Sequence, residues 1–167
     1  MARRRLTQTH SFMQPRIDHP GDLGLSLKVR KTLSKKELWL VQQNWRETYA
    51  RRLHTETGKW LLRGFDWHVF SYGYCEYLKS KLAERALENE LPATVLVFSD
   101  SGDTHVFGWS GELAELRTDR RDDIFVSSHD IIIAAQDFRW TFVLTHEFGR
   151  GPYFVSEQSM APRPHET

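Results

Sequence analysis

A histidine and a glutamate, His146 and Glu147, stand side by side near the end of the chain, directly after the apolar run of residues 140–145. A histidine that is oriented by a carboxylate can act as a general base or as a metal ligand. The run before them predicts a half-buried strand, in which successive side chains point to opposite faces. Unless the strand bends, His146 and Glu147 diverge. A strand-end pair that hydrogen-bonds nearby backbone is therefore the competing interpretation.

No complete catalytic or cofactor-binding motif accompanies this pair. A zinc-protease helix needs a second histidine four residues after His146, and that position is Arg150. The single cysteine, Cys75, excludes zinc sites that need several thiolates. The chain also lacks the Gly-x-Ser-x-Gly elbow and the phosphate-binding glycine loops. We therefore predict no metal and no cofactor. A small hydrolase or metal-dependent enzyme using His146 and Glu147 remains the alternative.

The loop after this pair has the composition of a binding surface. It runs from Phe148 to Phe154, two glycines permit unusual dihedral angles, and a proline stiffens its exit. Arg150, Tyr153 and Phe154 are residue types that protein interfaces favour. We predict that these three side chains and His146 contact a partner. Burial of Tyr153 and Phe154 in the core is the alternative.

The composition fits one folded domain. Of its 167 residues, 40% are hydrophobic and 13% aromatic, enough for a sizeable core. The 23 Lys and Arg nearly balance the 22 Asp and Glu, so we expect neither nucleic acid nor an anionic membrane as a partner. No apolar run is long enough to span a membrane, and the N-terminus lacks the apolar stretch of a secretory signal. With one cysteine, these features predict a cytoplasmic protein.

Two helices are predicted from apolar spacing. Ser34 and Glu37 form a capping box, in which each side chain can accept from an otherwise unpaired backbone N–H group. Apolar side chains then recur at helical spacing to about His54, namely Leu38, Val41, Trp45, Tyr49 and Leu53. A second helix is predicted over about residues 74–89, with Leu78, Leu82 and Ala86 or Leu87 on its apolar side.

The remaining apolar runs predict strands, at residues 65–71, 93–98, 104–109, 124–126, 131–134 and 140–145, and residues 153–155 are a candidate for an additional edge strand. Short connections favour antiparallel pairing. We predict an α+β fold, with a single antiparallel or mixed sheet of about five or six strands and two helices packed mainly on one face. The domain covers residues 34–158. Residues 1–33 form a tail or irregular lead-in, with a possible short strand around Leu25, Leu27 and Val29, and residues 159–167 form a flexible tail.

Three stretches resemble a family of small bacterial proteins that is catalogued only as a domain of unknown function: residues 66–71, 140–147 and 151–154. Their signatures are Trp-x-x-Phe-Ser and Thr-His-Glu…Gly-Pro-Tyr-Phe. The resemblance implies no activity and no catalytic residues. In size and build the chain is also similar to the immunity proteins of bacterial toxin systems. We therefore expect a non-enzymatic bacterial protein-binding domain, and an immunity-type protein that neutralises a toxin is one form of it. A structural or oligomerisation module is a further alternative.

Overall fold

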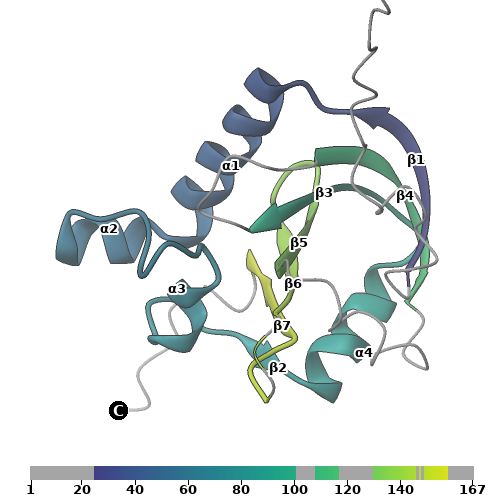
Figure 1. The fold of residues 1–167 in the computed structure, drawn as a ribbon. Helices are drawn as coiled ribbons and strands as arrows, with labels where there is room; N and C mark the ends of the chain where they lie inside the picture. The colour runs from purple at the N-terminus through teal and green to yellow at the C-terminus, as the bar shows by residue number, and fades with distance from the viewer. Residues whose placement is uncertain (1–24, 101–107, 117–129, 146, 148, 158–167) are drawn as a thin grey trace, which may run out of the picture.

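The computed structural model describes residues 25–100, 108–116, 130–145, 147 and 149–157. These residues form a curved sheet with helices on both faces (Figure 1). The strands are β1 (Leu25–Thr32), β2 (Leu78–Lys79), β3 (Ala93–Asp100), β4 (Gly108–Leu116), β5 (Asp130–Ala135), β6 (Trp140–Leu144) and β7 (Tyr153–Ser156). The helices are α1 (Lys35–Tyr49), α2 (Arg51–Thr57), α3 (His68–Ser71) and α4 (Lys81–Glu90). The prediction of an α+β fold with one sheet is confirmed, while the numbers of strands and helices were predicted too low.

The sheet has the strand order β1-β4-β3-β5-β6-β7-β2, and its neighbouring strands pair antiparallel. Its central strands are apolar on both faces, so side chains that alternate along one strand enter two different cores. Val97 and Ile133 lie in the core that α4 covers. Phe98 and Ile132 lie in the opposite core, beneath α1, α2 and α3. The prediction that the helices pack mainly on one face is therefore incomplete, because α4 covers the other.

The predicted capping box begins α1. The backbone N–H of Ser34 donates to Glu37 Oε2 at 2.9 Å, and the backbone N–H of Glu37 donates to Ser34 Oγ at 3.3 Å. The helix does not continue to His54, because Ala50 leaves helical geometry and a separate helix, α2, follows. That helix ends at Gly58, which adopts a left-handed conformation with φ of 71°.

The possible strand in the predicted lead-in is an edge strand of the sheet. β1 pairs with β4, with irregularities after Ser26 and after Val29. Between these irregularities the two backbones approach closely, and a Cβ added to Gly111 would lie 2.5 Å from the carbonyl oxygen of Lys28. A glycine is required there, because no side chain fits between the strands.

The predicted strand over residues 65–71 is wrong. Residues 66–70 are all buried, so burial there does not alternate, and the segment forms the short helix α3 from His68 onward. The predicted helix over residues 74–89 is also only partly right. It contains β2, then Ser80 with φ of 55°, and only then α4. Ala83 and Leu87 form the buried side of α4, while Leu82 is exposed.

The β3–β4 pairing was predicted; it runs from Gly108 to Leu113 of β4, and β4 itself continues to Leu116, where it pairs with β1. The start of the predicted partner strand and the predicted strand at residues 124–126 lie outside the described residues. No helix in the described part of the chain is long and apolar enough to cross a membrane.

Candidate functional site

Two buried aspartates mark one end of the sheet, beneath α3. Asp100 is the last residue of β3 and Asp130 is the first residue of β5, and the two are direct partners in the β3–β5 pairing. Both have almost no exposed surface. The side chain of Asp100 lies on the same face of the sheet as Phe98 and Ile132 and is directed at the segment that precedes α3.

Asp100 holds that segment through backbone hydrogen bonds. The N–H groups of Asp66 and Trp67 donate to the two oxygens of Asp100 at 2.9 and 2.8 Å. The indole N–H of Trp67 donates to Asp130 Oδ2 at 2.8 Å. Backbone groups that would otherwise be unpaired in the core are thus satisfied by carboxylates. The pair of aspartates fixes where α3 sits on the sheet.

A third buried carboxylate completes this network. Asp66 accepts two hydrogen bonds from the guanidinium of Arg46 on α1, at 2.7 and 2.9 Å. Burial raises the pKa of Asp66, although Arg46 acts to lower it. Burial and the nearby Asp66 also raise the pKa of Asp100 well above its usual range. The closeness of the two buried carboxylates of Asp66 and Asp100 favours retention of a proton by Asp100.

His68, the first residue of α3, lies beside this network with its ring almost fully buried. Its Nδ1 is 2.9 Å from the carbonyl oxygen of Leu62. Since a carbonyl only accepts, Nδ1 carries the proton and Nε2 holds the lone pair of the neutral ring. The pKa of His68 is lowered, mainly by burial and further by Arg150 and Arg63. The sequence placed His68 in the predicted strand at residues 65–71 and gave it no role of its own.

Of the predicted His-Glu pair, Glu147 is described by the structure and His146 lies outside the described residues. Glu147 is partly exposed, and its Oε2 is 3.0 Å from Nε of Arg150 in an ion pair. The hydroxyl of Thr145 donates to the backbone carbonyl of Arg150 and so ties the loop back to the end of β6. Arg150 itself is exposed, as a contact residue must be.

The side chains of Tyr153 and Phe154 are not available to a partner. They are 2% and 4% exposed and lie in different cores, because they are neighbours on one strand. The Tyr153 ring packs on Trp67 and Phe70, with ring centroids 6.2 and 5.5 Å away. The prediction that both side chains make contacts is corrected, and the core interpretation of these two residues holds.

Two other tyrosine side chains near this loop are exposed at the surface. Tyr72 and Tyr77 are 46% and 38% exposed, and Leu78 is exposed beside them. We call the following six residues the β2 surface: Arg63, Tyr72, Tyr77, Leu78, Lys79 and Arg150. Arg63 lies over the Tyr72 ring, while Tyr77 and Lys79 both lie against the buried Tyr153. Sequence reasoning missed this surface because it placed Tyr77 and Leu78 in a helix.

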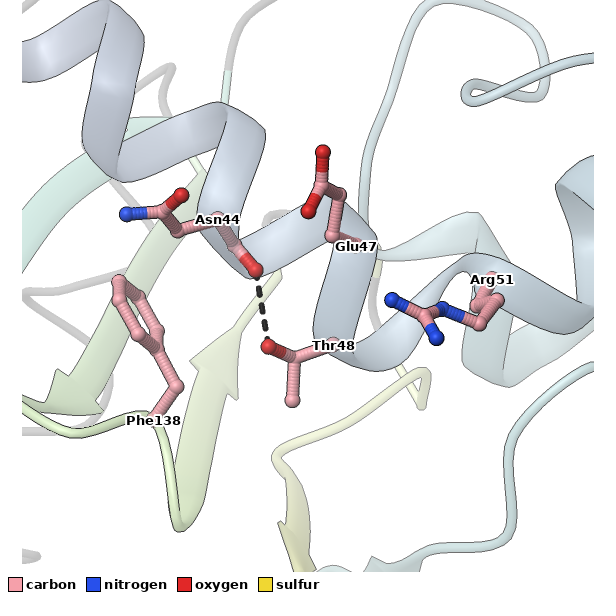
Figure 2. Close-up of a pocket in the computed structure, with 5 residues that line it drawn as sticks. All are labelled: Asn44, Glu47, Thr48, Arg51 and Phe138. Carbon is pink, nitrogen blue, oxygen red and sulfur yellow. Dashed lines mark hydrogen bonds between the residues drawn. The ribbon is translucent and has the colours of Figure 1, made fainter.

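A pocket of about 470 Å³ lies elsewhere on the molecule, between α1, the start of α2 and the β5–β6 turn. Figure 2 shows its lining residues, which are Asn44, Glu47, Thr48, Arg51 and Phe138.

Among the residues that the structure describes, no group of three or more His, Cys, Asp or Glu side chains is arranged to hold a metal ion. Burial raises the pKa of Cys75 to about 12, so its thiol is protonated at neutral pH.

Comparison with known proteins identifies a family. Its sequence profile, described as Domain of unknown function (DUF4275), matches residues 25–154. That range begins with β1 and ends within β7, so it covers nearly the whole sheet. No curated protein and no solved structure matches the chain. Because the profile covers most of the sequence, the chain belongs to the DUF4275 family.

Proposed function

We propose that this chain is a non-enzymatic protein-binding domain that uses the β2 surface to bind an acidic face of a partner protein. We further propose that it is a bacterial immunity-type protein whose partner is a toxin. The observation that carries the binding proposal is the exposure of tyrosine and leucine side chains beside arginine and lysine. Aromatic residues and arginine are the types enriched where protein interfaces derive most of their affinity.

The exposed aromatics support the location of the surface. Tyr72 and Tyr77 each keep one part of the ring in contact with the protein, Tyr72 against His68 and Tyr77 against Phe70 and Tyr153. A ring held in this way offers apolar area to a partner and loses little conformational entropy on binding. Tyrosine also has a hydroxyl group that can hydrogen-bond at the rim of an interface.

The charges support an acidic partner. Within the described part of the chain, neither Arg63 nor Lys79 forms an ion pair with a carboxylate; each lies instead over a tyrosine ring. Arg150 differs, because Glu147 already neutralises it. Two unmatched cations next to exposed aromatics are best complemented by carboxylates on the partner, which would raise the association rate and penalise basic proteins.

The framework supports a rigid surface. The N–H of Ser80, directly after β2, donates to the carbonyl of Pro152 at 2.9 Å, which ties β2 to the loop that carries Arg150. On the other side of the β2 surface, Asp100 accepts hydrogen bonds from the segment before α3. Figure 1 shows α3, β2 and β7 together at one end of the molecule. A surface that is ordered before binding avoids part of the entropic cost of association.

The test uses the protein encoded next to this chain, purified and titrated against it by calorimetry. We expect saturable binding that Tyr72→Ala with Tyr77→Ala weakens by about tenfold or more, as expected for central aromatic contacts. The charge-reversing pair Arg63→Glu and Lys79→Glu should weaken it as well, and more strongly at low salt. The matched control is Trp39→Ala, which removes an aromatic side chain that is 58% exposed on α1.

Thermal unfolding of each variant shows whether it remains folded. Undiminished affinity in both double variants, with folding intact, would refute the β2 surface. The immunity assignment has its own readout, since the wild-type chain should protect cells that express the neighbouring protein. Binding without protection would keep the binding proposal and reject the toxin partner.

A further inference from the structure

We infer that the pocket between α1 and the β5–β6 turn binds a small zwitterion with an apolar side chain, of the class of a free α-amino acid. This site is separate from the β2 surface and does not depend on the function proposed above. Its volume, about 470 Å³, lies within the range of small-molecule sites, roughly 300–1,000 Å³. It is open to solvent on one side, and helix and turn residues line it, namely Asn44, Glu47, Thr48, Arg51 and Phe138.

The pocket contains opposite charges that do not pair with each other. Glu47 and Arg51 are four residues apart, the spacing at which a continuous helix usually brings such side chains together. Here Ala50 ends α1 and α2 starts at Arg51, so the two residues belong to different helices. Within the described residues, neither charged group forms an ion pair. Figure 2 shows the carboxylate and the guanidinium on one side of the pocket and pointing in different directions.

The other side of the pocket is formed by an amide and a ring. The side-chain amide of Asn44 makes no hydrogen bond to any residue that the structure describes, while the hydroxyl of Thr48 donates to the Asn44 backbone carbonyl at 2.8 Å. In Figure 2 the Asn44 amide and the Phe138 ring lie together, across from Glu47 and Arg51. A ligand therefore meets its charged partners on one side and an aromatic ring on the other.

Phe138 is held in an unfavourable backbone conformation. Its φ is 58°, in the left-handed region where a residue with a Cβ is strained and glycine is not. The turn is fixed by two hydrogen bonds: the Phe138 N–H donates to the Ala135 carbonyl at 2.9 Å, and the Tyr49 hydroxyl donates to the Phe138 carbonyl. Glycine would relieve this strain and remove the ring. Strained residues of this kind concentrate at ligand sites.

These groups match one kind of molecule. An ammonium group complements Glu47, a carboxylate complements Arg51, and an apolar side chain packs on Phe138 while Asn44 offers both a donor and an acceptor. An anion alone would leave Glu47 unmatched, and a cation alone would leave Arg51 unmatched. A zwitterion satisfies both, which selects the amino acid class over simple carboxylates or amines.

The probe is L-phenylalanine, titrated into the isotope-labelled full chain and followed by NMR. We expect saturable shifts of the amides of Asn44, Thr48 and Phe138 with a millimolar dissociation constant. Two analogues each lack one charge, 3-phenylpropionate and 2-phenylethylamine, and glycine lacks the ring. Each should bind about tenfold more weakly, the scale of one lost interaction of about 1.4 kcal/mol.

Variants assign each contact. Arg51→Gln should weaken L-phenylalanine but leave 2-phenylethylamine unchanged, and Glu47→Gln should weaken L-phenylalanine but leave 3-phenylpropionate unchanged. Phe138→Gly should abolish binding, with Phe138→Leu as a second variant if glycine unfolds the turn. The control is Arg52→Gln, since Arg52 neighbours Arg51 but is paired with Glu56 at 2.7 Å. Absence of saturable shifts, or equal binding of L-phenylalanine and its charge-deleted analogues, would overturn the proposal.

Discussion

Replacement of Asp100 by asparagine tests whether the buried carboxylates hold α3 on the sheet. The variant keeps the shape of the side chain but replaces one accepting oxygen with an NH₂ group. One of the two backbone N–H groups, that of Asp66 or of Trp67, then faces a donor instead of an acceptor. An unsatisfied buried N–H costs about 1–3 kcal/mol, so the free energy of unfolding should fall by about that amount.

The size of this loss should depend on pH. Burial raises the pKa of Asp100 well above its ordinary value of 3.8. At pH values between 3.8 and the raised pKa, Asp100 is protonated in the folded chain and ionised in the unfolded chain. The contribution of Asp100 to the stability of the wild type is therefore full below pH 3.8. It declines as the pH rises towards the raised pKa, by at most about 1.4 kcal/mol per pH unit. The asparagine of the variant does not titrate, so the difference between variant and wild type should shrink as the pH rises.

Urea unfolding at a series of pH values, from about 4 upward, measures this difference through the midpoint at constant m-value. The control is Glu88→Gln, which removes an exposed carboxylate from α4. Equal stability of wild type and Asp100→Asn at every pH would refute the view that Asp100 anchors α3. A gap that widens with rising pH would contradict the direction given for its pKa.

Two further predictions concern other buried polar groups. Thr141→Val should destabilise the fold by about 1–3 kcal/mol, because the Trp45 indole N–H donates to the Thr141 hydroxyl at 2.9 Å and would lose its acceptor in the core. Denaturant unfolding should show that Trp45→Phe costs less when Thr141 is already replaced than in the wild type, and full additivity would argue against this bond. The His68 imidazole should titrate below its ordinary pKa of 6.5, and Arg63→Gln should raise its pKa because Arg63 lowers it; an NMR titration at or above 6.5, or one unchanged by the substitution, would contradict this.

Features fixed by neighbouring residues were predictable from the sequence. The Ser34–Glu37 capping box and the strands β3 and β6 depend on spacing within a few residues, and each was placed to within a few positions. The segment around α3 was not, because its conformation depends on hydrogen bonds to Asp100, which is more than thirty residues away in the sequence. Aromatic residues at 65–70 favour a strand by composition, and tertiary contacts override that preference.

The residues of the candidate site also differ in how far their surroundings depend on neighbouring residues in the sequence. Arg150 was predicted to contact a partner, and its exposure in a loop flanked by glycines is compatible with that prediction. Tyr153 and Phe154 were assigned to the surface on residue type alone, although the next element, β7, takes both into the sheet. The pocket beside Phe138 had no local signal at all, because its walls come from α1, α2 and a turn more than eighty residues later.

The strand order has a consequence for how the protein is made. β1 and β2 come first in the chain among the described strands and form the two outer edges of the sheet. Their partners come much later, since Thr32 pairs with Trp109 and Leu78 with Phe154. During synthesis both edge strands leave the ribosome before the strands that they pair with, and closing such long loops carries an entropic cost. The central strands lie closer to one another in the sequence and can pair as they emerge. Each edge is thus closed by a strand that is translated later, β1 by β4 and β2 by β7, so β2 has no strand to pair with until the last described strand has been made.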